Sequence, residues 1–141
     1  MEVKDIMTRG AVSVSPGESV EVAARTMLRC NVGALPVCNG GRLCGLITDR
    51  DIVTRCLAAG KVAGVTTVQQ VMTEQVTAVN PNMEVGAAAH LMGRLQVRRL
   101  PVVENGRLCG IVSLGDLARR EETVLDAADV LTDVSGNLSD R

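Results

Sequence analysis

The sequence has no phenylalanine, tyrosine or tryptophan among its 141 residues, and it has a single histidine. Without aromatic rings, the chain has no stacking platform for single-stranded nucleic acid. Its formal net charge of -1 also lacks the basic excess that nucleic-acid binders usually carry. We therefore expect no nucleic-acid partner.

Long apolar runs are also missing. No stretch approaches the roughly 18 residues that a membrane-spanning helix needs, and the opening MEVKDIMTRG has no apolar signal-peptide core. We expect a cytoplasmic protein without a membrane partner. A reducing cytosol favours free thiols over a disulfide framework for the five cysteines, Cys30, Cys38, Cys44, Cys56 and Cys109.

The chain contains an internal repeat. At an offset of 65 positions, residues 3–53 align with residues 68–118 without a gap, and 20 of the 51 pairs are identical. Chance would give about four identities at ordinary composition. We therefore place repeat 1 at 1–60, a linker at 61–67, repeat 2 at 68–122 and an acidic tail at 123–141.

Each copy predicts the same order of elements, α-β-α-β-β-α. The first long helix has apolar residues at i, i+3, i+4 and i+7, with Ser19 as its N-cap in copy one and Glu84, a poor cap, in copy two. Two apolar strands then flank a tight turn, where Asn105-Gly106 suits a type I′ hairpin and Gly40-Gly41 does so nearly as well. The remaining expected segments are short helices at 3–7 and 68–72, extended stretches at 11–15 and 76–80, and closing helices at about 49–59 and 114–122.

One such unit is marginal by itself, because a chain of about 60 residues buries too little of its surface. We expect a mixed α/β (α+β) fold in which the two copies pack sheet to sheet about a pseudo-twofold axis.

The closing helix of each copy begins with a shared motif. Residues 45–51 read GLITDRD and residues 110–116 read GIVSLGD, so both fit G-h-x-[ST]-x-x-D, in which h is apolar. A strand that runs directly into a helix N-terminus presents free backbone N–H groups to an anion. An aspartate one turn into the helix can accept hydrogen bonds from both hydroxyls of a cis-diol.

This motif, the LPVV strand, the NG turn and the MT…V…P opening together resemble the CBS (cystathionine β-synthase) domain, present as a tandem pair over about residues 1–120. The resemblance implies a sensing module that binds AMP, ADP, ATP or S-adenosylmethionine in clefts between the copies. The aspartate would hold the ribose and the serine or threonine would meet the phosphate side. It also implies a homodimer and an unknown downstream protein partner. The predicted ligand-binding residues are Thr48, Arg50, Asp51, Arg98, Arg99, Ser113 and Asp116.

The two predicted sites are not equivalent. Arg98-Arg99 precedes the LPVV strand of copy two, where copy one has Gly33-Ala34. We expect the Asp116 site to favour a phosphorylated ligand more than its counterpart in copy one. Because the chain lacks aromatic rings, adenine would lie between aliphatic side chains such as Val14, Val32, Val79 or Val97.

Other interpretations of the same residues stay open. The [ST]-x-x-D pattern is close to a capping box, so the four motif residues can simply cap their helices in a dimerisation or scaffold module. The cysteines raise a thiol redox sensor as a weaker alternative, but neither their spacing nor His90 fits a metal site. No nucleophile–base pair stands out, so we expect no enzyme.

The tail predicts a short amphipathic helix over 123–134. Three outcomes stay open for it: docking on the chain's own body, docking on a dimer partner, or a frayed tail without docking. Its expected apolar face consists of Val124, Ala127, Ala128, Leu131 and Val134.

Overall fold

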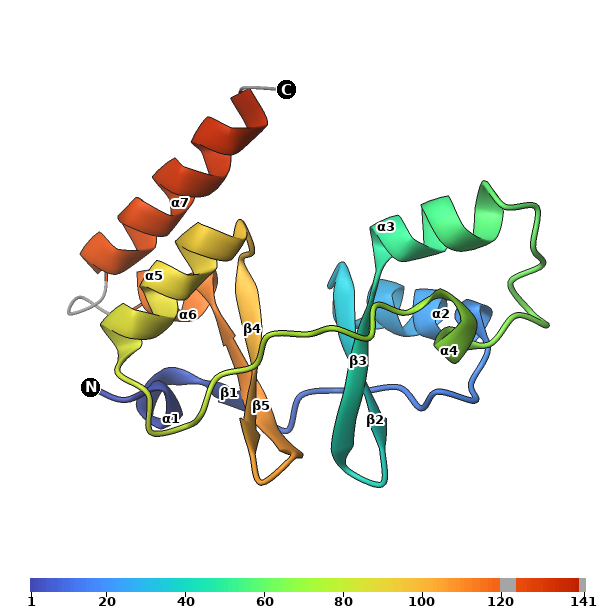
Figure 1. The fold of residues 1–141 in the computed structure, drawn as a ribbon, viewed down its shortest axis with the longest axis horizontal. Coiled ribbons are helices and arrows are strands. Elements are labelled where there is room, and N and C mark those ends of the chain that lie inside the picture. Colours follow the sequence, from blue (N-terminus) through green and yellow to red (C-terminus); the bar gives the residue numbers. More distant parts are fainter. Residues whose placement is uncertain (120–123, 140–141) are drawn as a thin grey trace. The chain divides into compact units, whose positions relative to one another are not determined.

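The computed structural model describes residues 1–119 and 124–139. The chain divides into two compact units (Figure 1): unit 1 comprises Met1–Ala11 and Thr77–Arg141, and unit 2 comprises Val12–Val76. These units differ from the repeats of the sequence. The opening segment of each repeat belongs to the compact unit that holds the rest of the other repeat.

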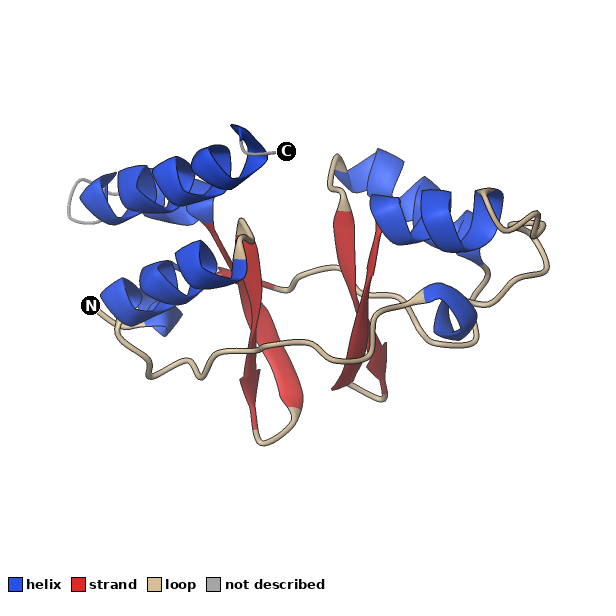
Figure 2. Ribbon diagram, turned by 45° about the horizontal axis from the view of Figure 1, so that its top comes forward, coloured by secondary structure: helices blue, strands red, loops and turns tan. Residues whose placement is uncertain are grey.

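Both units combine a β-hairpin with helices (Figure 2). The elements of unit 2 are α2 (Val20–Cys30), β2 (Ala34–Asn39), β3 (Arg42–Thr48), α3 (Asp49–Asp51), the π-helical segment η1 (Ile52–Leu57) and α4 (Val68–Val71). The elements of unit 1 are α1 (Val3–Ile6), β1 (Thr8–Arg9), α5 (Val85–Leu95), β4 (Arg99–Glu104), β5 (Arg107–Ser113), α6 (Leu114–Ala118) and α7 (Val124–Ser139).

The two long helices α2 and α5 follow the predicted periodicity. The Oγ of Ser19 accepts a hydrogen bond from the backbone N–H of Val22 at 3.2 Å, which confirms Ser19 as the N-cap of α2. Glu84 makes no side-chain capping bond at the start of α5, as expected. Both helices end at a residue in the left-handed region, Asn31 with φ 54° and Gln96 with φ 59°.

The two hairpins are antiparallel, β2 with β3 and β4 with β5. Both residues of each turn have positive φ, 60° and 85° at Gly40-Gly41 and 54° and 80° at Asn105-Gly106. These angles confirm the predicted type I′ character. The extended stretches before α2 and α5 join the hairpins by single parallel bridges, Val14 to Val37 and Val79 to Val102.

The closing helices differ from their predicted ranges. In unit 2, the predicted helix at about 49–59 is α-helical only in α3 and continues as the π-helical segment η1. That segment ends at Leu57 instead of residue 59. Apolar spacing indicates which face is buried, but it does not distinguish a bond to residue i−4 from one to residue i−5. In unit 1, α6 ends at Ala118, and part of the predicted range 114–122 lies outside the described residues.

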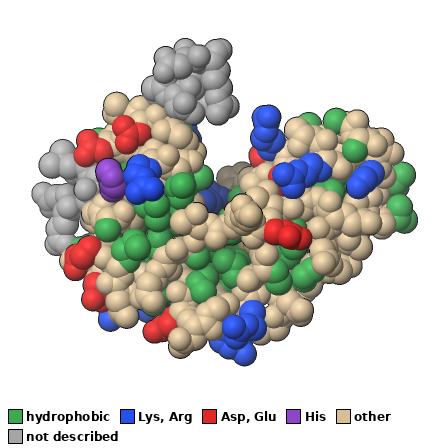
Figure 3. All heavy atoms as spheres, viewed as in Figure 1, with side chains coloured by type: hydrophobic (Ala, Val, Ile, Leu, Met, Phe, Trp, Pro, Cys, Tyr) green, Lys and Arg blue, Asp and Glu red, His purple; other side chains and the backbone are tan. Residues whose placement is uncertain are grey.

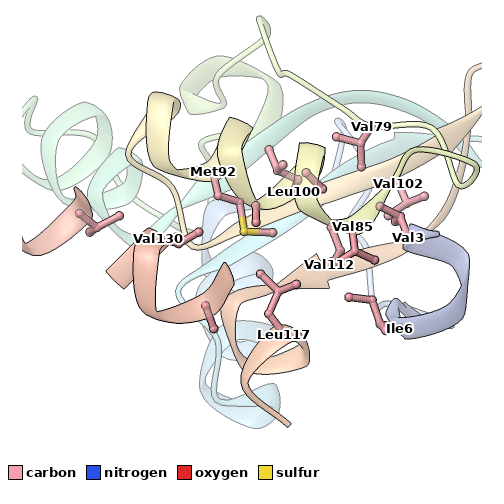
Figure 4. Close-up of a cluster of buried hydrophobic side chains, with 14 residues drawn as sticks. Val3, Ile6, Val79, Val85, Met92, Leu100, Val102, Val112, Leu117 and Val130 are labelled. Carbon is pink, nitrogen blue, oxygen red and sulfur yellow. The ribbon is translucent and has the colours of Figure 1, made fainter. Parts of the chain in front are cut away.

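Each unit has its own hydrophobic core. The core of unit 1 (Figure 4) draws on α1, α5, α6, both hairpin strands and α7. The helix α7 packs against α5 and α6, which confirms docking of the tail on the chain's own body. Among the α7 side chains that the structure describes, Ala127, Val130 and Val134 are buried, whereas Ala128 and Leu131 are exposed. The side chain of Val124, which was also predicted for the apolar face, lies outside the described part. The predicted apolar face was therefore wrong in part, because neighbouring helices rather than hydropathy alone choose the contact stripe.

Candidate functional site

The turn from β5 into α6 holds the first candidate site. The Oγ of Ser113 accepts a hydrogen bond from the N–H of Asp116 at 3.1 Å, and the Asp116 carboxylate accepts one from the N–H of Ser113 at 2.8 Å. The two residues thus form a reciprocal capping box. Asp116 is only 3% exposed, so the fold holds a carboxylate in its interior at the start of a short helix.

Two further groups contact the Asp116 carboxylate. The hydroxyl of Thr8 donates a hydrogen bond at 3.3 Å, and the guanidinium of Arg119 forms an ion pair and a hydrogen bond with Oδ1. Thr8 belongs to repeat 1 in sequence but reaches this site because β1 pairs with β5, with Thr8 opposite Ile111. The site of the second repeat is therefore completed by the opening of the first.

The turn from β3 into α3 repeats this arrangement in unit 2. The Thr48 hydroxyl accepts from the N–H of Asp51 at 3.0 Å, and the Asp51 carboxylate accepts from the N–H of Thr48 at 3.0 Å. The hydroxyl of Thr73 lies 3.3 Å from both carboxylate oxygens of Asp51. Here the ion pair is longer, at 3.8 Å from Nε of Arg55 to Asp51, and that guanidinium also donates to the carbonyl of Met72 at 3.0 Å.

A close backbone approach explains the glycine of each motif. A Cβ on Gly45 would lie 2.6 Å from the carbonyl oxygen of Thr73, and a Cβ on Gly110 would lie 2.5 Å from that of Thr8. The segment that carries each site threonine therefore passes directly over the motif strand, at a separation that only glycine permits.

The predicted arginines lie around these turns with exposed side chains. Arg98 and Arg99 precede and begin β4, and the carbonyl of Arg98 accepts a hydrogen bond from the N–H of Leu114 at 2.8 Å. This bond places the backbone of Arg98 beside the start of α6. Arg50 is exposed in the first turn of α3.

Some residues of the site were not predicted. Thr8 and Thr73 contact the two carboxylates, and both belong to the identical Met-Thr pair of the repeat, which was the available signal. Arg55 and Arg119 are not equivalent to each other: under the offset of 65, Arg55 corresponds to Arg120 and Arg119 corresponds to Thr54, so only Arg55 carried a repeat signal, just beyond the aligned segment. Of the valines considered for adenine, Val14 and Val79 are buried in the two cores, whereas Val32 and Val97 are partly accessible.

Among the described residues, the thiols and the histidine belong to no cluster of three metal-ligating side chains. All five cysteines are free, with Cys38 and Cys56 buried. Burial raises the pKa of the Cys38 thiol, a hydrogen bond with Ser13 lowers it in part, and nearby Cys44 raises it slightly. His90 is exposed on α5 (Figure 3). In the part of the chain that the structure describes, no three metal-ligating side chains cluster and no helix has the length and hydropathy for a membrane span.

Comparison with known proteins gives a consistent result. The family model of the CBS domain matches residues 3–58 and 68–123. The CBS domain-containing protein YhcV of Bacillus subtilis (strain 168) is 44% identical over 133 residues, which cover 94% of each chain. Hypoxic response protein 1 of Mycobacterium tuberculosis (strain ATCC 25618 / H37Rv) is 38% identical over 117 residues, 82% of each chain.

The solved structures that are similar to this chain include the following three. Hypoxic Response Protein I with two coordinated zinc ions has a TM-score of 0.78 at 37% identity, covering 85% of this chain and 98% of that one. CBSX2 in complex with AMP has a TM-score of 0.77 at 28% identity, covering 88% and 98%. The CBS domain pair of MJ0100 with 5-methylthioadenosine and S-adenosyl-L-methionine has a TM-score of 0.74 at 30% identity, covering 84% and 94%.

Proposed function

Because this chain belongs to the CBS-domain family, with two CBS domains in tandem, we propose that it is a regulatory module that binds an adenosine-containing ligand. The ligand class is AMP, ADP, ATP or S-adenosylmethionine. Two similar structures support this ligand class: CBSX2 was solved with AMP, and the MJ0100 pair was solved with S-adenosyl-L-methionine. The protein acts without catalysis, in the cytoplasm, by changing a surface that a downstream protein recognises.

The observation that carries this proposal is a buried carboxylate repeated at two equivalent turns. Asp51 and Asp116 are 7% and 3% exposed, and each lies beside a threonine hydroxyl and an arginine. A carboxylate held in this way can exchange its hydroxyl and guanidinium partners for the two hydroxyls of a ribose. Helix capping by itself requires neither of those partners.

We assign the site residues the roles that the family resemblance implies, and their positions support this assignment. Asp116 and Asp51 accept from the ribose, while Ser113 and Thr48 stand at helix starts where backbone N–H groups favour an anion. Arg98, Arg99 and Arg50 supply exposed cations for phosphate. Since the backbone of Arg98 lies beside the start of α6 and Arg99 follows it, the Asp116 site favours a phosphorylated ligand more than the Asp51 site does.

A scaffold function is the second candidate, and a specific observation favours it. Both capping boxes are complete, so all four motif residues already have a structural role. In this alternative the pair dimerises without a ligand.

The test of this proposal relies on the weak ultraviolet absorbance of a chain without aromatic residues. A protein without tyrosine and tryptophan is nearly transparent at 280 nm, so bound adenine is visible in the absorbance of the purified sample. We would denature the protein, identify any released compound by chromatography with mass detection, and then follow thermal unfolding by circular dichroism with each adenosine ligand.

A released adenine compound, or a rise in Tm that grows with ligand concentration, supports the sensing module, because a ligand that binds only the folded state stabilises it. Inosine monophosphate is the matched control for the adenine ring. No released compound and no shift at millimolar ligand would leave the scaffold function as the conclusion.

A further inference from the structure

Unit 1 has a small cavity between α1, the segment before α5 and the hairpin of β4 and β5. Its volume is about 200 Å³, and its lining includes the thiol-bearing residue Cys109 of β5. Cys109 is partly exposed and free, and its thiol donates a hydrogen bond to the carbonyl of Arg107 at 3.7 Å. The cavity is smaller than the roughly 300–1,000 Å³ of sites for drug-sized ligands, so it suits a group about the size of an amino acid.

Charges of both signs line the same cavity. Arg9, Lys4 and Glu104 all contribute to its lining, and all three residues are exposed. Lys4 is already engaged, because its ammonium forms an ion pair with Glu2 at 3.0 Å and donates a hydrogen bond to Asn82 at 3.3 Å. Arg9 and Glu104, in contrast, have no ion-pair partner among the described residues. One free cation and one free anion therefore line the cavity together with the thiol.

This combination is complementary to an amino-acid group. The guanidinium of Arg9 can bind a carboxylate through two parallel hydrogen bonds, and the carboxylate of Glu104 can accept a hydrogen bond from an ammonium. A ligand with these two groups and a sulfur atom would match all three lining groups at once. A ligand with carboxylates alone would meet like charge at Glu104.

The internal repeat offers a comparison for the thiol. The residue of unit 2 that is equivalent to Cys109 is Cys44, which is also partly exposed and free. The Cys44 thiol donates a hydrogen bond to the carbonyl of Arg42 at 3.6 Å, again two residues earlier in the chain. The two thiols therefore have the same local geometry.

The charges at the equivalent positions differ. Under the offset of 65, the position of Arg9 is occupied in unit 2 by Glu74. The position of Glu104 is occupied by Asn39. Cys44 thus has the geometry of its counterpart without the pair of a free cation and a free anion, which makes it an internal control.

We propose that the cavity beside Cys109 is a covalent binding site for a low-molecular-weight thiol that carries an amino-acid group, such as cysteine or glutathione. The ligand is held as a mixed disulfide with Cys109, with its carboxylate on Arg9 and its ammonium on Glu104. The disulfide form of such a thiol is the co-reactant, so the site fills when that form accumulates. The inference is independent of the adenosine ligand, because none of these three residues belongs to the aspartate sites.

The step is a thiol–disulfide exchange. The Cys109 thiolate attacks one sulfur of the symmetric disulfide, so that a bond from Sγ to this sulfur forms while the original S–S bond breaks. The other half leaves as a thiolate with the electron pair of the broken bond and takes up the proton that Cys109 lost. No further oxidant or reductant is needed, and an excess of the reduced thiol reverses the step.

The test compares the two cysteines within one molecule. The reduced full chain is incubated with oxidised glutathione, alkylated and digested with trypsin, and mass spectrometry follows the peptides 108–119 and 43–50, which carry Cys109 and Cys44. We expect Cys109 to gain glutathione at least about tenfold faster than Cys44, since complementary charges raise encounter rates by this factor or more. Hydroxyethyl disulfide, which is uncharged, is the matched control reagent and should modify the two thiols at similar rates.

Two variants exchange the charges between the repeats. Arg9→Glu gives unit 1 the residue of unit 2 and should slow the reaction of Cys109 with oxidised glutathione. Glu74→Arg makes the reverse change and should speed the reaction of Cys44. Both positions are exposed, and thermal unfolding by circular dichroism verifies that the variants fold. Neither change should alter the rates with hydroxyethyl disulfide, which separates recognition of charge from altered exposure of the thiol.

Equal rates for Cys109 and Cys44 with oxidised glutathione would overturn the site. So would the same preference for Cys109 with hydroxyethyl disulfide, because exposure of the thiol would then explain it. A rate at Cys109 that Arg9→Glu leaves unchanged would overturn the assignment of the ligand carboxylate to Arg9.

Discussion

Asp116 and Asp51 occupy equivalent positions, but the groups around them differ. Asp116 has a close ion pair with Arg119 and two arginines, Arg98 and Arg99, beside its helix start. Asp51 has the longer contact with Arg55, and Arg50 is exposed in the first turn of the helix that Asp51 belongs to. The two sites are therefore expected to differ in affinity for phosphate although their capping geometry is the same.

The first prediction concerns this difference. Asp116→Asn keeps a capping acceptor but removes the charge that receives the ribose hydroxyls, and we expect it to weaken binding of a phosphorylated adenosine ligand by about tenfold or more. Asp51→Asn is the matched control and should change that affinity less. Titration calorimetry measures both, and a larger loss for Asp51→Asn would reverse the ranking of the sites.

A second prediction concerns the thiols. Burial raises the pKa of Cys38, so at pH 8 less of it is thiolate than of an ordinary cysteine, and the pH at which it becomes reactive moves upward. We expect iodoacetamide to modify the partly exposed Cys109 before Cys38, as mass spectrometry of the digested protein would show. Equal rates for the two thiols at pH 8 would contradict the buried environment of Cys38.

At the scale of elements, the two sites form because the opening segment of each repeat crosses over to pack on the motif strand of the other repeat. β1 reaches β5 in unit 1, and Thr73 pairs with Leu46 of β3 in unit 2 by two backbone hydrogen bonds of 2.8 and 2.9 Å. Each of these segments brings a threonine hydroxyl within hydrogen-bonding distance of an aspartate carboxylate. The strand residue next to the threonine backbone must then be glycine, because a Cβ there would meet the threonine carbonyl oxygen.

This crossing leads to a third prediction. Gly110→Ala would place a Cβ 2.5 Å from the carbonyl oxygen of Thr8, and we expect it to lower the free energy of unfolding by about 2 kcal/mol, as overpacking usually does. The control is Gly86→Ala on α5, where nothing lies within 4 Å of the added Cβ. That change should raise the free energy of unfolding by roughly 0.5 kcal/mol, since alanine favours a helix. Urea unfolding measures both, and a neutral Gly110→Ala would argue against the close approach.

At the scale of the whole molecule, the chain is built from two units with separate cores, and the buried α7 side chains that the structure describes belong to the core of unit 1. We therefore expect α7 to stabilise unit 1. Val130 is 1% exposed within that core, whereas the next residue, Leu131, is 47% exposed.

The fourth prediction follows from these neighbours. Val130→Asp buries a charge in the core of unit 1 and should lower the free energy of unfolding by about 3 kcal/mol or more. Leu131→Asp places its charge on an exposed position and should change that free energy little. Hydrogen exchange would then show lost protection over α5 with protection of α2 retained. A similar loss of stability in both variants would show that α7 does not dock in this register. So would a loss of hydrogen-exchange protection that is spread equally over the two units.

The elements and the family could be predicted from the sequence because their signals are local or repeated. The spacing of Val20, Ala23 and Met27, the Ser19 cap and the Asn105-Gly106 turn depend on neighbours a few residues away, and the structure confirms each of them. The offset of 65 identified the duplication, and with it the motif that the CBS family shares.

Tertiary structure decided the features that join distant segments. That Thr8 contacts Asp116, that Gly110 lies under the backbone of Thr8, and that Val130 rather than Leu131 is buried all depend on which elements pack together. Local periodicity carries no information about that choice, because an amphipathic helix can turn its apolar stripe by one residue to suit its neighbour.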